Sequence, residues 1–411
     1  MSVQYTQISA GASVYFRIYC VRWITGVVSG RMFRIRPRRG KNARSGLEFI
    51  ERRFHMITIT NPVPAFETFH EFLGYDPERC LFFDIETTGL SPSSSFVFLI
   101  GAVCRTDGQW QLTQYLAQSR EDEPGILASF FQLAKNRDAL LHFNGTSFDL
   151  PYLAQRAETF HLENPLCEKV SLDLYQTFRS LKAFLGLPRM NQTTLESYLK
   201  WNRQDLLTGK HMISLFRKYT ASGEQGLEDL LLLHNHDDLI GMTHILKMSA
   251  YCMLQNGRLK EVSARKTQHS AVFSFLLEAP LPEPLSFTVK GIYHISVYGN
   301  HGELSVSICT DELVYFFPDY RNYYYLPLED QAIHKSVGAF VDRDHRIQAK
   351  PENCYIRKTG SFLPQPALIF EPCLRKSFSD KQQYFELTEP FSPESSKLLV
   401  YIREVLKQNP D

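Results

Sequence analysis

The chain has 411 residues, of which 44% are hydrophobic and 22% are charged, as is ordinary for a soluble globular protein of two or three domains. No segment approaches the roughly 18 uninterrupted apolar residues of a membrane span, so we expect no membrane partner. The net charge of +1 hides an asymmetry: residues 1–55 have a net charge of +9, residues 56–264 of −6 and residues 265–411 of −2.

Residues 1–55 form a basic N-terminal arm that contains RMFRIRPRRGKNAR. This arm could contact phosphates or act as a targeting sequence. It could equally be disordered, or not be translated at all, since Met56 is a plausible start. Arg17 and Arg22 interrupt its apolar stretch, which argues against a secretory signal. The eight cysteines show no CxxC pair and no zinc-ligand spacing, and they predict reduced thiols in a cytoplasmic protein.

The segment 56–260 predicts an α/β domain. A helix is expected over 64–74, followed by strands over 80–86, 96–105 and 110–118 that are separated by turn residues. Further elements are a helix over 121–136, a buried strand over 138–143, a helix over 148–160, a strand leading into a helix over 170–180, and a long helix over 227–254. Three strands followed by alternating helices and strands indicate a mixed sheet covered by helices.

Residues 265–411 have a different character and predict a β-rich (α+β) domain. Short strands joined by glycine-containing turns are expected over 287–317, and an amphipathic helix over 394–408. The aromatic segment FFPDYRNYYYLPLED (316–330) either fills a small β-core, the interpretation we favour, or offers stacking platforms for single-stranded bases.

Two carboxylates stand one residue apart in LFFDIETTGL (81–90). Side chains alternate along a strand, so Asp84 and Glu86 project to the same face, where two unpaired like charges repel. A divalent cation removes this repulsion, since carboxylate oxygens suit Mg²⁺ or Mn²⁺; the alternative is a solvated sheet edge.

Two weaker motifs follow. Asp149 opens a helix after the turn FNGTS, where it is either an N-cap or a metal ligand. In HNHDD (234–238), His234 and Asp238 are four residues apart and share a helix face, as a satisfied polar pair or as part of a site.

Together, D-x-E-T-T-G, FNGTSFD and HNHDD resemble the DEDD-type 3′–5′ exonuclease superfamily, and within it the bacterial YprB-like branch. SLDLY around Asp173 and NQTTLESYLKWNRQDLLTG, with Glu196, Arg203 and Asp205, also fit that branch. The resemblance covers about residues 78–255. It implies a ribonuclease-H-like fold with a mixed five-stranded sheet flanked by helices.

The resemblance also implies the roles of the site residues. Asp84, Glu86, Asp149 and Asp238 would hold two divalent ions, Mg²⁺ or Mn²⁺, and His234 would orient or deprotonate the attacking water. Contacts to the terminal nucleotide would come from Thr87, Thr88, Asn144 and Ser147. The superfamily's subtypes have Tyr four residues before the last Asp or His five before it; His234 stands at the Tyr spacing, and Asp237 is a second candidate for the last ligand.

These residues lead to the expectation of a metal-dependent 3′–5′ exonuclease acting on single-stranded DNA or RNA. Two alternatives remain open, namely a nucleic-acid-binding module with a weak or idle nuclease centre and a structure-specific endonuclease on the same fold. The sequence does not distinguish DNA from RNA.

Overall fold

The computed structural model describes residues 55–205, 207–388, 391 and 393–411, and also the backbone of three strands nearer the N-terminus. These strands, β1 (Ile24–Val28), β2 (Arg31–Pro37) and β3 (Leu47–Arg53), form an antiparallel sheet. The rest of the basic arm lies outside the described residues, and its expected disorder or lack of translation stays a prediction. The chain divides into unit 1 (Met1–Arg179 with Arg189–Leu246) and unit 2 (Ser180–Pro188 with Lys247–Asp411).

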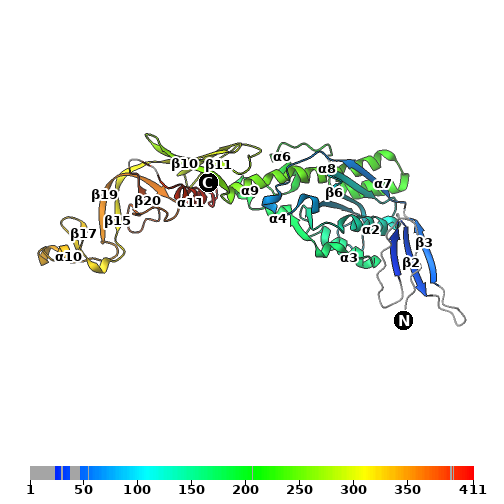
Figure 1. Cartoon of the computed structure of the whole chain (residues 1–411), viewed down its shortest axis with the longest axis horizontal. Helices are drawn as coiled ribbons and strands as arrows, with labels where there is room; N and C mark the ends of the chain where they lie inside the picture. The colour runs from blue at the N-terminus through cyan, green and yellow to red at the C-terminus, as the bar shows by residue number, and fades with distance from the viewer. Residues whose placement is uncertain are drawn as a thin grey trace. The chain divides into compact units, whose positions relative to one another are not determined.

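Unit 1 is built on a six-stranded mixed sheet in the order β4-β7-β6-β5-β8-β9. Figure 1 labels strand β6 of this sheet, among the helices of the unit. The first four strands in this order pair antiparallel, whereas β5 with β8 and β8 with β9 pair in parallel. The strands are β4 (Ile57–Pro62), β5 (Cys80–Thr87), β6 (Val97–Thr106), β7 (Gln109–Leu116), β8 (Ala139–His142) and β9 (Val170–Asp173).

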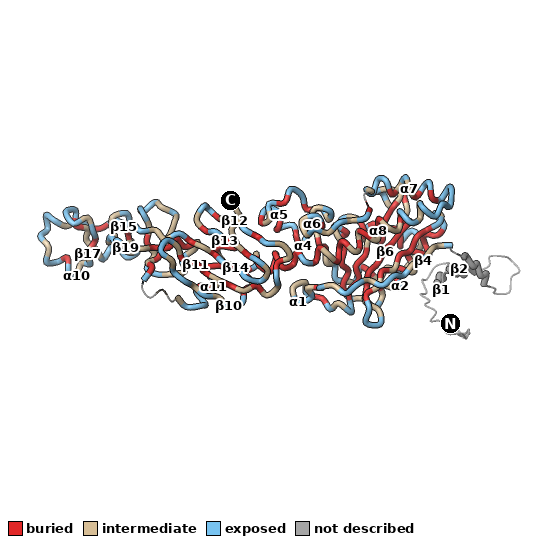
Figure 2. Tube along the Cα trace, turned by 90° about the horizontal axis from the view of Figure 1, so that it is seen from above, coloured by how far each residue is buried: buried red, intermediate tan, exposed pale blue. Residues whose placement is uncertain are grey.

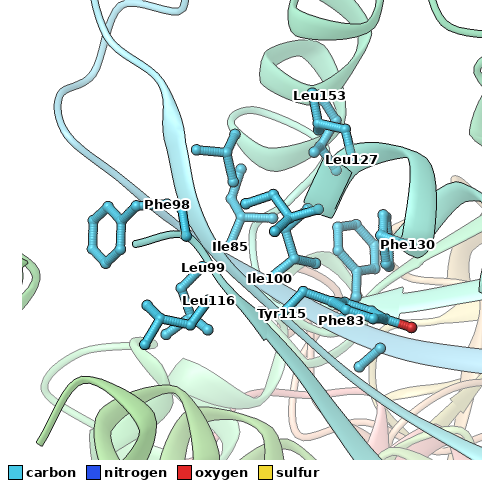
Figure 3. Close-up of a cluster of buried hydrophobic side chains, with 14 of the residues drawn as sticks. Phe83, Ile85, Phe98, Leu99, Ile100, Tyr115, Leu116, Leu127, Phe130 and Leu153 are labelled. Atoms are coloured by element: carbon cyan, nitrogen blue, oxygen red, sulfur yellow. The ribbon is translucent and has the colours of Figure 1, made fainter. Parts of the chain in front are cut away.

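The central strands are buried on both faces of the sheet, which explains their nearly continuous apolar sequences. Figure 2 shows β6 as a buried strand. On one face, Phe83 and Ile85 of β5 meet Leu127 and Phe130 of helix α2 and Leu153 of helix α3 (Figure 3). Alternation along β5 therefore directs Asp84 and Glu86 to the opposite face.

Seven α-helices and three 3-10 turns in the described part of unit 1 follow the order of the chain. They are α1 (His70–Leu73), α2 (Glu123–Ala134), α3 (Asp149–Phe160), α4 (Leu174–Phe178), α6 (Gln192–Tyr198), α7 (Gly209–Ser222) and α8 (Gln225–Ile245), with 3-10 turns at Pro77–Arg79 and Arg120–Asp122. A third 3-10 turn spans Pro165–Glu168. Helix α8 lies against β5, β6 and β7 on the face that carries Asp84.

The expected fold class is confirmed, with three differences in detail. The sheet gains a sixth strand, β4, which pairs with β7 at the edge. The helix expected over 64–74 is reduced to α1, because Phe69 before it adopts a left-handed backbone with φ of 50°. The long helix expected over 227–254 is broken into α8 and α9 (Ser249–Gln255) by a 3-10 turn at Leu246–Met248.

Unit 2 is β-rich, as expected for the C-terminal region. A five-stranded antiparallel sheet has the order β10-β11-β14-β13-β12, and two three-stranded sheets have the orders β15-β19-β20 and β17-β16-β18. The five-stranded sheet consists of β10 (Leu259–Lys266), β11 (Ser270–Leu277), β12 (Leu285–Val289), β13 (Tyr293–Tyr298) and β14 (His301–Ser307). The terminal helix α11 (Ser395–Leu406) packs Tyr401 against Phe273 of β11, with 4.9 Å between ring centroids.

The two smaller sheets contain the aromatic segment. Their strands are β15 (Cys309–Phe316), β16 (Tyr323–Leu326), β17 (Gln331–His334), β18 (Ile347–Gln348), β19 (Tyr355–Gln365) and β20 (Gln383–Glu386), and helices α5 (Leu181–Phe184) and α10 (Lys335–Gly338) also belong to unit 2. Phe317, Tyr323 and other aromatic side chains pack around Ala332, Ala349 and Cys354. These aromatic side chains therefore fill a small β-core, as the favoured interpretation predicts. Across the described residues of both units, no helix is both long and apolar enough to cross a membrane.

Candidate active site

Strand β5 brings the first two carboxylates to the face of the sheet that α8 covers. Asp84 is half-buried and Glu86 is 9% exposed, and the strand pairing is irregular immediately after Glu86. Asp84 pairs across the ladder with Gly101 of β6, which has no side chain to cover it. The acids therefore lie in the interior of the domain and not on a solvated edge.

Asp149 is the first residue of α3, and it is 7% exposed. The N-cap position belongs to Phe148, so Asp149 is not the helix N-cap that was the alternative interpretation. Its carboxylate accepts a hydrogen bond from the backbone of Ile85, the residue between Asp84 and Glu86. This contact connects the start of α3 to the acidic strand.

Helix α8 contributes His234 and Asp238, one turn apart. The Nε2 atom of His234 is 3.3 Å from Oε1 of Glu86 and 3.5 Å from Oδ2 of Asp238. One ligand atom from each of these three residues lies within 4.8 Å of the others, a spacing that suits a metal ion. On its other side, Nδ1 of His234 is hydrogen-bonded to Asp205.

Asp237 faces away from this cluster. Its Oδ2 accepts hydrogen bonds from the backbone amides of Gln204 and Asp205, at 2.7 and 2.9 Å, and it is 1% exposed. Asp237 thus holds the loop before α7, whereas Asp238 points towards Glu86 and His234.

The acidic side chains repel one another strongly. Burial raises the pKa of Asp84 and of Glu86 well above the ordinary range of a carboxyl, and the negative charge of Asp238 adds to both shifts. Burial also raises the pKa of Asp149 to about 7. Among the described residues, Asp84, Glu86 and Asp149 form no ion pair with a lysine or arginine.

This donor set fits divalent cations. Buried carboxylates without cationic partners are unfavourable unless a positive charge neutralises them, and carboxylate oxygens are the ligands that Mg²⁺ and Mn²⁺ prefer. The Nε2 atom of His234 lies on the same side of the cluster, within 4.8 Å of ligand oxygens of Glu86 and Asp238. The arrangement suits binding of a metal ion and, through it, of a phosphate.

Sequence reasoning missed Asn235, which lies on α8 where this helix packs on β5, β6 and β7. Its Nδ2 donates to Oδ2 of Asp84 at 3.0 Å, and its Oδ1 accepts from Nε2 of Gln114 on β7 at 2.9 Å. Gly101 lies between Asp84 and Gln114 in the ladder, and a Cβ there would collide with Asn235. A signal was present, because Asn235 interrupts the buried apolar stripe of Leu231 and Leu239 at a spacing of four.

The loop after α6 supplies the cationic partner of Asp238. The Nη1 atom of Arg203 is 2.7 Å from Oδ1 of Asp238, and its Nε donates to Oε2 of Glu196 at 2.5 Å. Burial opposes the charge of Arg203, but the two carboxylates outweigh it and raise its pKa. Glu196, Arg203 and Asp205 fitted the family resemblance by sequence, but their positions around Asp238 and His234 required the structure.

The two threonines expected to contact substrate differ. The hydroxyl of Thr87 is buried and donates to the carbonyl of Gly89 at 2.9 Å. Thr88 is partly exposed, and its hydroxyl accepts from the backbone amide of Phe96 at 3.1 Å. Thr88 is therefore the better placed of the two to meet a ligand.

Asn144 and Ser147 lie together in the turn after β8. The hydroxyl of Ser147 donates to Oδ1 of Asn144 at 2.9 Å, and Asn144 has a left-handed backbone with φ of 61°. Asp173 fixes this turn, since it accepts hydrogen bonds from the backbone amides of Asn144 at 2.9 Å and Thr146 at 3.3 Å. Asp173 thus supports the turn that precedes Asp149.

Comparison with known proteins agrees with this fold. Residues 81–249 match the RNase_H superfamily, and the mixed sheet of unit 1 is that of a ribonuclease-H-like domain. No curated protein matches the chain.

Several solved structures are also similar. The family B DNA polymerase from the hyperthermophilic archaeon Pyrobaculum calidifontis has 13% identity and a TM-score of 0.33 over 61% of this chain and 37% of that one. A product-bound exonuclease I has 14% identity and a TM-score of 0.26, over 53% and 58% of the two chains. The zinc-bound E. coli exonuclease I complex with single-stranded DNA has 13% identity and a TM-score of 0.27, over 53% and 54%. The chain thus spans about half the length of these exonucleases.

Proposed function

We propose that unit 1 is a metal-dependent 3′–5′ exonuclease of the DEDD type, in its YprB-like branch, that removes nucleotides from single-stranded DNA or RNA. The observation that carries this proposal is the cluster of Glu86, His234 and Asp238, whose ligand atoms lie within 4.8 Å of one another, with Asp84 and Asp149 close enough to interact electrostatically with Asp238. These acids come from a strand and two helices. Burial, together with nearby negative charge, raises the pKa values of Asp84, Glu86 and Asp149, and no lysine or arginine of the described residues pairs with these three.

Asp84, Glu86, Asp149 and Asp238 would hold two divalent cations, Mg²⁺ or Mn²⁺. When bound, the cations would supply charge for the scissile phosphate and lower the pKa of a water molecule that attacks it. Net charge supports this role, because residues 56–264 carry −6 and would otherwise repel a polyanion.

His234 would take the proton of the attacking water. Its Nδ1 is hydrogen-bonded to Asp205, so the proton of the neutral ring belongs on Nδ1 and Nε2 is left as the basic atom. Nε2 faces Glu86 and Asp238, the side on which the reaction would occur. Thr88, Asn144 and Ser147 would contact the terminal nucleotide, with Thr87 supporting the turn.

The test is a gel time course on 5′-labelled single-stranded DNA and RNA with Mg²⁺, Mn²⁺ or EDTA. We expect a ladder of shortened 5′-labelled products that requires metal and is lost in the Asp84→Ala variant. Asp330→Asn in unit 2 is the matched control, because it removes a carboxylate charge outside the site and should retain activity.

Other outcomes separate the alternatives. Cutting of a closed circular single strand would indicate an endonuclease. A folded chain that binds oligonucleotides but cleaves none with either metal would refute the exonuclease and leave a binding module.

A further inference from the structure

A pocket lies beside the loop that follows β5. It has a volume of about 400 Å³ and lies between this loop, the 3-10 turn at Arg120–Asp122 and the C-terminal half of α7. Its lining residues are Thr88, Ser94, Ser95, Phe96, Ser119, Arg120, Phe216, Arg217 and Thr220. Two arginines and several hydroxyls around one cavity are the chemistry of an anion site.

The two guanidinium groups are the donors available to a ligand. Neither Arg120 nor Arg217 has an ion pair with an acid among the described residues, and Arg120 lies 5.8 Å from the ring centroid of Phe96. The hydroxyls are already engaged: Ser95 bonds to Tyr152 at 2.7 Å and Ser119 to Asp122 at 3.2 Å. A bound anion would therefore depend mainly on the arginines.

Helix α7 is basic within an acidic region. It carries Lys210, Arg217 and Lys218 and no Asp or Glu, although residues 56–264 have a net charge of −6. The pocket lies near the C-terminal end of this helix, whose dipole disfavours an anion. The positive side chains have to overcome this effect, so binding should be sensitive to their removal.

The pocket is close to the acidic cluster along the chain. Thr88 lines the pocket, and it follows Glu86 by two residues, a span of at most about 7 Å. A strand with its 3′ end at Glu86 could therefore continue past Thr88. The half-buried ring of Phe96 offers an apolar surface beside the arginines, as a base requires.

We propose that Arg120 and Arg217 bind a backbone phosphate of the single strand whose 3′ end enters the acidic cluster, with Phe96 against the adjoining base. This inference rests on the proposed nuclease function and adds a contact upstream of the reacting end. The ligand class is a single-stranded nucleic acid, recognised by its phosphate and the face of a base.

The test compares Arg120→Ala/Arg217→Ala with Lys218→Ala, which removes a charge from the same helix outside the pocket lining. Binding of a fluorescein-labelled oligothymidylate is measured by anisotropy in EDTA at several salt concentrations. We expect the double variant to bind about tenfold more weakly, and the slope of log K against log salt to fall by about 0.7 for one lost phosphate contact. Lys218→Ala should lose less than threefold, a change of about 0.7 kcal/mol.

Hydrolysis adds a readout that separates this pocket from the reacting centre. The p-nitrophenyl ester of thymidine 5′-monophosphate occupies only that centre, so the double variant should lose about tenfold more kcat/KM on the oligonucleotide than on the ester. The proposed role of the pocket would be contradicted if the double variant lost as much activity on the ester as on the oligonucleotide. It would also be contradicted if the double variant bound oligonucleotide like the wild type, or if Lys218→Ala weakened binding as much as the double variant does.

Failure of the nuclease proposal is distinguishable from failure of the pocket. A wild-type chain that binds oligonucleotide through the arginines but hydrolyses nothing contradicts the nuclease alone. A chain that hydrolyses oligonucleotide with metal but binds none in EDTA contradicts the pocket alone, and a chain that does neither contradicts both.

Discussion

Units 1 and 2 differ in whether they bury charged side chains. Among the described residues of unit 2, the buried polar side chains are the uncharged Ser249 and Gln365. Unit 1 buries Glu86, Asp122, Glu123, His142, Asp149, Arg156, Asp173, Glu196, Asp205, His234 and Asp237. Because burying a charge is unfavourable without compensation, unit 1 is where chemistry is to be expected.

The buried charges of unit 1 are themselves of two kinds. Glu123 and Arg156 form a closed pair, with Nε of Arg156 2.7 Å from Oε1 of Glu123, and Glu123 also accepts from the amide of Val97 at 3.0 Å. Asp84, Glu86 and Asp149 lack such a partner, and burial, with the negative charge of neighbouring acids, raises the pKa of each. A buried ion pair such as Glu123 with Arg156 stabilises the fold. Buried carboxylates without a cationic partner indicate a binding site for a cation.

The largest stability effect is expected from breaking the closed pair. Arg156→Ala leaves Glu123, which is fully buried, without its cation, and should lower the free energy of unfolding by about 3–5 kcal/mol. Urea denaturation of the metal-free chain measures this loss. A loss below about 1 kcal/mol would mean that water compensates Glu123.

The open cluster should make the metal-free protein less stable at higher pH. Burial raises the pKa of Asp149 to about 7, whereas a carboxyl of the unfolded chain titrates near about 4. Between these values the native state binds more protons than the unfolded state, so stability is greatest below about pH 4 and falls as the pH rises to about 7. Asp84 and Glu86 shift in the same direction.

Between about pH 4 and pH 7, we expect the free energy of unfolding, measured with urea in EDTA, to fall on the order of a few kcal/mol. The fall should be smaller in the Asp149→Asn variant. Mn²⁺ at high pH should restore stability, because it binds the native carboxylates. A pH profile identical in Asp149→Asn and wild type would contradict the assignment. The comparison between these two chains also cancels the contribution of His142, whose burial lowers its pKa.

A matched pair of glycines separates packing from chemistry. A Cβ at Gly101 would collide with Asn235 and Leu239, and a Cβ at Gly302 in unit 2 would collide with the ring of Phe275. Each change to alanine should cost about 1–3 kcal/mol of stability. Only Gly101→Ala should also reduce nuclease activity at a temperature where both variants are folded, since Asn235 holds Asp84. Equal activity of the two variants would show that this contact does not matter for catalysis.

The smallest effect is expected for the exposed charges of unit 2. Asp330 accepts hydrogen bonds from Tyr325 and Tyr355, both at 2.6 Å, and with Arg357 they lower its pKa to about 2. Arg357 is 44% exposed, so Arg357→Ala should cost roughly 0–1 kcal/mol in thermal or urea unfolding. If Arg357→Ala lowered the free energy of unfolding as much as Arg156→Ala, the contrast between buried charges in unit 1 and exposed charges in unit 2 would not hold.

The sequence predicted the parts of the site that depend on local geometry. The alternation of a strand is enough to put Asp84 and Glu86 on one face, and the family resemblance added Asp149, His234 and Asp238. The sequence ranked Asp238 above Asp237 as the last ligand, but it could not show what Asp237 does instead. That role depends on the loop at Gln204, whose backbone amide donates to Asp237. Asn235 and Gly101 were missed since their roles exist only where α8 crosses the sheet.

The hydrogen bond between Asp84 and Asn235 joins residues 151 positions apart in the chain. Contacts of such high sequence separation require most of the intervening chain to be in place, and they tend to form late in folding. A nascent chain that ends before Asp238 lacks one of the four acids altogether. Assembly of the acidic cluster is thus tied to completion of the domain.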